Sequence, residues 1–138
     1  MGDRSNIVVV QPDESRIWLY GHWMGDDNYR VAGQVLSEGG RNSDHAYLTR
    51  ILFSKMIAHD IHGTSGFGIS NTMQDNEYFI VVIDPQKQTV HLEQYEWVAS
   101  DLTEITPHIS FEEFVNAYSV SDSLNDLAVN MGAQLTVA

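Results

Sequence analysis

The sequence predicts an α+β fold: a mainly antiparallel sheet of about five strands with three to four helices packed on one face. The β-branched run Ile7 to Val10 and the apolar run Tyr78 to Ile83 are typical of packed strands. Apolar residues recur at three- and four-residue steps between Tyr47 and Ile57, which indicates an amphipathic helix. Ser110 followed by Glu113 is the capping-box pattern that begins another helix.

In chain order the pattern predicts strands at 6–11 and 16–20, helices from 26 or 27 to 36 and from 44 to about 59–62, a short strand at 67–70, a hairpin of 78–83 with 89–95, and helices at 111–118 and 122–131. Gly39 and Gly132 are expected to follow helix ends. Residues 134–137 fit either a tail or an added edge strand.

The two strands of the predicted hairpin, 78–83 and 89–95, have different patterns. The first arm is apolar on both sides, so we expect it to lie centrally in the sheet. The second arm alternates, with Val90 and Leu92 on one face, and Thr89, His91, Glu93 and Tyr95 on the other. That pattern predicts a half-exposed strand, whose exposed alternation favours pairing between copies and a homodimer.

Composition limits the class of protein. A chain of 138 residues, 43% hydrophobic and 19% charged, is expected to form one globular domain over 1–138. It has no cysteines, so disulfides and thiolate metal sites are excluded. Neither a transmembrane run nor the features of a signal peptide are present, which favours a cytoplasmic location without membrane attachment.

The charge balance is strongly acidic, with 19 acidic and 7 basic residues and a net charge of −12. Direct binding to nucleic acid is not expected, because phosphate neutralisation needs lysine and arginine. The acidity fits either simple solubility or an acidic face that docks on a basic partner surface or mimics nucleic acid.

A glycine- and hydroxyl-rich loop runs from Gly63 to Asn71. It lacks the Gly-Lys-Ser/Thr ending of a P-loop. It is either a tight connection or a pocket whose backbone N–H groups hold an anion. His22-Trp23 would add an aromatic platform, and Arg50 would either pair internally with an acid or hold the ligand. Asp75-Asn76-Glu77 would act as a turn cap, as ligand contacts or in acid–base chemistry. The candidate ligand-binding residues are His22, Trp23, Arg50, Ser65, Gly66, Gly68, Ser70, Asn71, Asp75, Asn76 and Glu77.

Catalytic and metal motifs are weak. His59, Asp60 and His62 are close in sequence but lack a second ligand pair. No spacing joins His45, His91 and His108, and there is no Gly-x-Ser-x-Gly elbow. We therefore predict no metal, no cofactor and no catalytic residue.

Several segments together resemble those of a small group of proteins from actinobacterial tailed phages. These are Gly2 to Ile7, Gly21 to Gly25, Tyr47 to Ile51, Gly66 to Ser70, Asp75 to Glu77 and Asp84 to Val90. The resemblance covers roughly residues 2–95. It implies a phage or prophage protein in the cytoplasm of a bacterial host, and it implies no activity.

The preferred hypothesis is a non-enzymatic phage accessory protein that binds a host macromolecule, a host protein above all, through an acidic surface. The alternative is a module that binds or sequesters a small anionic, nucleotide-like molecule. A minor virion protein, or a small hydrolase that uses Asp75 or Glu77 with His22, is a weaker alternative.

Overall fold

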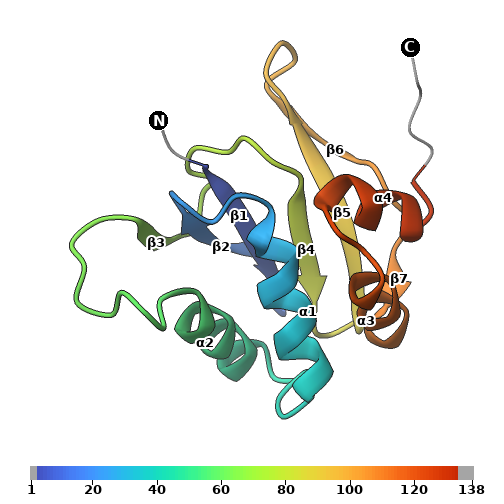
Figure 1. Ribbon diagram of the computed structural model, residues 1–138, viewed down its shortest axis with the longest axis horizontal. Coiled ribbons are helices and arrows are strands. Elements are labelled where there is room, and N and C mark those ends of the chain that lie inside the picture. The colour runs from blue at the N-terminus through green and yellow to red at the C-terminus, as the bar shows by residue number, and fades with distance from the viewer. Residues whose placement is uncertain (1–2, 134–138) are drawn as a thin grey trace.

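The computed structural model describes residues 3–133. Its sheet runs in the order β3-β2-β1-β4-β5-β6, and β7 pairs with the first two residues of β5 (Figure 1). The strands are β1 (Ser5–Val10), β2 (Arg16–Gly21), β3 (Phe67–Ser70), β4 (Ile80–Asp84), β5 (Thr89–Glu96), β6 (Asp101–Glu104) and β7 (Ile109–Ser110). Only β1 and β4 pair in parallel; all other described pairs are antiparallel. The α+β, mainly antiparallel prediction is confirmed, but about five strands was too few, because β6 and β7 are short and carry no apolar run.

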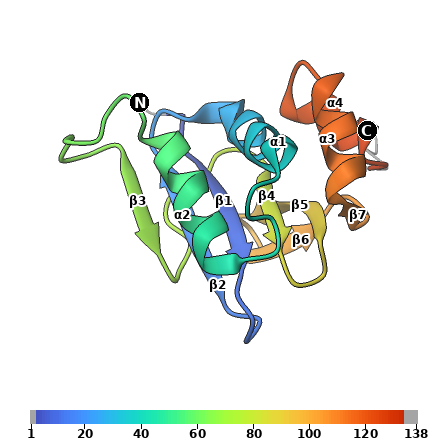
Figure 2. The same ribbon diagram turned by 90° about the horizontal axis from the view of Figure 1, so that it is seen from below.

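The helices lie on one face of the sheet, as predicted (Figure 2). They are α1 (Asn28–Glu38), preceded by the 3₁₀ turn η1 (Gly25–Asp27), then α2 (His45–Met56), α3 (Phe111–Ser119) and α4 (Leu124–Asn130). The predicted capping box at Ser110 and Glu113 is present. The helix α2 ends at Met56, before the expected 59–62, because the apolar stripe stops there and Ile61 is exposed.

The sheet has two apolar faces. Helices cover the larger core, which includes Leu19, Val81 and Leu92. The opposite face buries a smaller cluster of Val8, Trp18, Ile80 and Val82, against which Met73 and Leu102 pack. This second face is closed by loops and long side chains rather than by helices.

The predicted half-exposed character of β5 is wrong at His91 and Glu93, although Gln94 and Glu96 at the end of the strand are exposed. His91 is 6% and Glu93 is 3% exposed, because the second face is covered at this point. In addition, β5 lies between β4 and the pair β6 and β7. It is therefore not an edge, and the predicted pairing of copies through β5 loses its basis. The first arm of the hairpin, β4, is central as predicted.

None of the helices within residues 3–133 is long and apolar enough to span a membrane. The predicted tail or edge strand at 134–137 lies outside the described residues.

Candidate functional site

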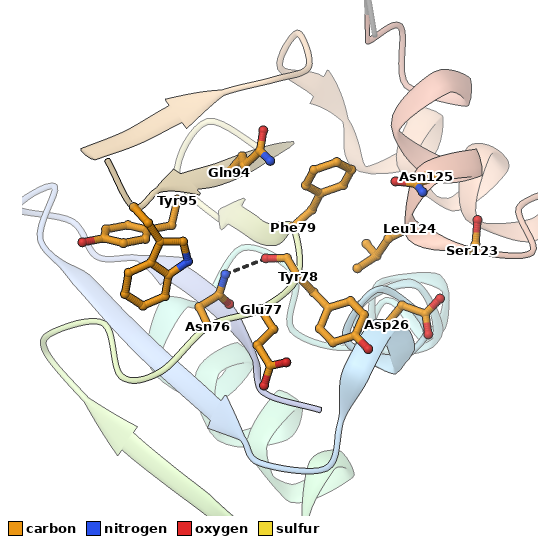
Figure 3. Close-up of a pocket in the computed structure, with 11 residues that line it drawn as sticks. Asp26, Asn76, Glu77, Tyr78, Phe79, Gln94, Tyr95, Ser123, Leu124 and Asn125 are labelled. Atoms are coloured by element: carbon orange, nitrogen blue, oxygen red, sulfur yellow. Dashed lines mark hydrogen bonds between the residues drawn. The ribbon is translucent and has the colours of Figure 1, made fainter. Parts of the chain in front are cut away.

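A cavity of about 310 Å³ lies between the end of β5 and the start of α4 (Figure 3). Its walls come from η1, from the segment that precedes β4, from β5 with the residue after it, and from the first turn of α4. The lining residues are Asp26, Asn76, Glu77, Tyr78, Phe79, Gln94, Tyr95, Trp97, Ser123, Leu124 and Asn125. Only Asn76 and Glu77 among them were predicted as site residues.

Aromatic rings form much of the wall. Tyr95 and Trp97 meet edge to face, with ring centroids 4.7 Å apart and an interplanar angle of 84°. Trp97 is 65% exposed, an unusual position for so large an apolar side chain. Exposed aromatic faces bind apolar groups, flat groups and cations.

The charged groups that line this cavity are carboxylates, and no lysine, arginine or histidine is among the lining residues. Glu77 is partly neutralised by Arg4, whose Nη1 lies 3.7 Å from its Oε1. The carboxylate of Asp26 has no ion-pair or hydrogen-bond partner within residues 3–133. Burial and a hydrogen bond to Asp3 raise the pKa of Tyr78, so its hydroxyl stays protonated and donates to Asp3 Oδ1 at 3.2 Å.

Trp97 also borders a second cavity of about 410 Å³, lined by Tyr20, Met73, Gln74 and Asp75. The exposed indole therefore has a hollow on two sides. Tyr20 contacts the predicted site residue His22, with 2.9 Å between its hydroxyl and Nδ1.

The triplet Asp75-Asn76-Glu77 fixes its loop to the start of β1. Arg4 lies 3.7 Å from each of the two carboxylates, and the Glu77 N–H donates to the Arg4 carbonyl at 2.8 Å. The buried Asn6 side chain donates to Asn76 Oδ1 at 3.1 Å. Arg4 and Asn6 are thus distant partners of the triplet, whereas Asn76 Nδ2 also donates to the Tyr78 carbonyl at 2.6 Å, a local contact of the kind expected for a turn cap.

The predicted aromatic platform does meet the glycine-rich loop. The His22 N–H donates to the Gly66 carbonyl at 2.7 Å, and the rings of His22 and Trp23 lie 4.3 Å apart. Gly66 has φ +100°, a conformation that favours glycine. Ser65 and Asn71 are exposed, Gly68 lies in β3, and the Ser70 hydroxyl accepts from the Thr72 N–H within the loop.

Arg50 does not join these residues. It is exposed on α2, and its guanidinium makes no ion pair or hydrogen bond within the described part of the chain. The predicted internal pairing of Arg50 is therefore wrong. The proposed acid–base set does not assemble either, since Asp75 and Glu77 pair with Arg4 while His22 contacts Tyr20.

Sequence reasoning missed a second polar group, on the sheet face opposite the helices. Arg16 donates two hydrogen bonds to Glu93, and the Glu93 Oε2 lies 2.7 Å from His91 Nε2. Burial opposes ionisation of Glu93, but the hydrogen bonds from Arg16 and His91 outweigh it and lower the pKa to about 2. The rings of His91 and His108 stack 4.0 Å apart. The alternation of β5 puts His91 and Glu93 on one face, but nothing in the sequence pattern places His108 beside them.

Comparisons with protein-family models, curated proteins and solved structures find no significant match. Any function must therefore be argued from the geometry of this chain.

Proposed function

We propose that this protein is a non-enzymatic accessory protein that binds a basic segment of a partner protein, with the cavity beside Trp97 as receptor for a lysine or arginine side chain. Following the resemblance to phage proteins, the partner would be a protein of the bacterial host, met in the host cytoplasm.

The observation that carries the proposal is the presence of an exposed indole and an unpaired carboxylate in one cavity. Trp97 offers a face to a cation, a contact worth about 0.5–2 kcal/mol. Asp26 supplies a negative charge that no basic residue within the described chain neutralises. A cationic side chain complements both groups, whereas an anion would be repelled.

The overall charge favours the same kind of partner. A net charge of −12 attracts a basic surface at long range and raises its association rate, most strongly at low salt. The alternative of a small anionic ligand has less support, because this cavity carries carboxylates and Arg50 does not line it.

A small neutral or cationic molecule is a second candidate occupant. The cavity volume of about 310 Å³ lies at the lower end of the range for small-molecule sites. The openness of Trp97 to solvent favours the protein partner, since a site dedicated to a small molecule encloses most of its ligand.

Binding of a dye-labelled peptide of alternating lysine and glycine, followed by fluorescence anisotropy, tests the proposal. We expect saturable binding that weakens with salt and no binding of the matching glutamate peptide. Asp26→Asn and Trp97→Ala should each weaken the binding about fivefold or more, which corresponds to roughly 1 kcal/mol.

Two variants provide matched controls. Asp27→Asn removes the same charge one residue away, at an exposed carboxylate that does not line the cavity. Trp23→Ala removes another exposed indole outside it. Equal losses in the test and control variants, or no binding of the lysine peptide, would overturn the proposal.

A further inference from the structure

The chain between β6 and β7 brings two potential metal ligands to one residue of β5. Glu104, at the end of β6, pairs with Glu93, and Ile109 of β7 pairs with Val90. His91 and Leu92 of β5 lie between these two residue pairs, and residues 105–108 lie opposite them.

The backbone here forms a bulge. The Ile105 N–H donates to the Leu92 carbonyl at 3.0 Å, and the Leu92 N–H donates to Thr106 Oγ1 at 2.9 Å. Four residues, 105–108, therefore lie opposite two residues of β5, so this segment carries two extra residues. Bulges redirect side chains, and this one turns Glu104 and His108 toward the same point.

That point is His91 Nε2. It lies 3.7 Å from Glu104 Oε2, and His108 Nε2 lies 3.0 Å from Glu104 Oε1. The three donor atoms of His91, Glu104 and His108 all lie within 4.8 Å of one another. Ligands of a single Zn²⁺ lie about 2.0–2.2 Å from the ion, so their donor atoms are about 3–3.5 Å apart. The observed separations therefore exceed that spacing by less than about 2 Å.

The charges around these donors favour a cation. Glu93 and Glu104 are two carboxylates, and Arg16 is the single cationic side chain that contacts either of them within residues 3–133. Both oxygens of Glu93 accept hydrogen bonds from Arg16, and Glu93 Oε2 also lies 2.7 Å from His91 Nε2, so this contact with Glu93 must be exchanged for the ion when Nε2 becomes a ligand.

We propose that His91, Glu104 and His108 bind a divalent transition-metal ion such as Zn²⁺. Two imidazoles and one carboxylate suit zinc, cobalt and nickel rather than magnesium or calcium. His91 is buried and fixed, whereas Glu104 and His108 are 56% and 42% exposed, so the ion would keep a coordination position open to water.

Two adjustments are required on binding: His91 Nε2 gives up its hydrogen bond to Glu93, and His108 changes its ring orientation. The rings of His91 and His108 are nearly parallel, at 8°, and an ion cannot lie in the plane of both. His108 must rotate to point its Nε2 lone pair at the ion, and its exposure leaves room for this. Glu104 moves with it, because no other side chain within residues 3–133 holds it besides the two histidines.

Titration of the protein, without a histidine tag, with Co²⁺ tests the inference through the visible absorption of bound cobalt, followed by displacement with Zn²⁺. We expect one equivalent to bind. His108→Ala and Glu104→Gln should weaken binding by roughly 100-fold, since even loss of an outer-shell partner costs about 10–100-fold. Both residues are exposed, so the variants should fold, and circular dichroism checks this.

The matched control is the double variant His59→Ala, His62→Ala, which removes two exposed imidazoles close in sequence to Asp60. It should bind Co²⁺ as the wild type does. Absence of cobalt binding by the wild type, or a loss in the control equal to that in His108→Ala, would overturn the inference. Failure of the lysine-peptide experiment would not affect it.

Discussion

Arg16 on β2 reaches over β1 and β4 to bind Glu93 on β5, with its Nη1 and Nη2 donating to the carboxylate at 2.8 and 2.6 Å. Its guanidinium also lies 5.9 Å from the ring centroid of Trp18. This bridge crosses the sheet face that no helix covers. It therefore helps to bury the second apolar cluster, in which Val8 and Val82 are fully buried.

We expect Arg16→Met to destabilise the protein by about 3 kcal/mol, because it leaves the buried Glu93 carboxylate without its cation. Glu93→Gln should cost less, about 1–2 kcal/mol, because the Arg16 side chain remains 29% exposed to water. Urea unfolding measures both values. A larger loss in Glu93→Gln than in Arg16→Met would contradict the burial argument.

The same pair predicts a dependence of stability on pH. The pKa of Glu93 is about 2 in the folded protein, below its ordinary value of 4.5. Its contribution to stability is therefore present above about pH 4.5 and is lost as the pH falls toward 2. In the presence of a chelator, the difference in unfolding free energy between wild type and Glu93→Gln should shrink between about pH 7 and pH 3. A constant difference would contradict it.

Local patterns predicted much of the fold, because hairpins and helix starts depend on neighbouring residues. Ser110 caps α3 through Glu113, and Asp44 caps α2, as the sequence indicates. The exposure of β5 was mispredicted because an alternating strand is usually solvated on its polar face. Here Arg16 and Met73, which are distant in sequence, and Leu102 of the neighbouring strand β6 cover that face.

The candidate sites depend still more on distant contacts. Asp26, Tyr78 and Trp97 line one cavity from separate segments, and none carries a motif. His91 and His108 meet through a bulge between two strands too short for periodicity to predict. By contrast, the sequence correctly placed His22 beside the loop that contains Gly66, but it wrongly added Arg50 to the same site.

Gly33 in α1 is expected to be required for packing rather than for backbone freedom. A Cβ at this position would overlap the ring of Tyr118 on α3. Gly33→Ala gains about 1 kcal/mol in helix propensity but should lose more through overpacking, with a net destabilisation of about 1–2 kcal/mol. Thermal unfolding would show a lower Tm.

The control for this variant is Gly40→Ala. A Cβ at Gly40 meets nothing within 4 Å, so the variant should be neutral or stabilised by up to about 1 kcal/mol. If Gly33→Ala were as stable as Gly40→Ala, α1 and α3 would have to be able to separate at this contact.

Asn76 is expected to hold the wall of the Trp97 cavity to the sheet. Its Nδ2 donates to the Tyr78 carbonyl at 2.6 Å, drawn in Figure 3, and its Oδ1 accepts from Asn6. Asn76→Ala removes the side-chain donor of the partly buried Tyr78 carbonyl and one of the two acceptors of Asn6 Nδ2, which should cost about 2 kcal/mol in urea unfolding. Asn71→Ala, at an exposed position of the same connection, should stay within about 0.5 kcal/mol of wild type.

Hydrogen exchange distinguishes a local effect of Asn76→Ala from a general loss of stability. The Glu77 N–H donates to the Arg4 carbonyl, next to the two hydrogen bonds that join Asn76 to Asn6 and Tyr78; these two bonds are called the Asn76 clamp. Exchange of the Glu77 N–H should accelerate by more than that of the Val82 N–H in the central strand β4, because the Asn76 clamp opens locally before the sheet does. Equal acceleration at both amides would mean that Asn76 stabilises the whole domain and does not position the cavity wall.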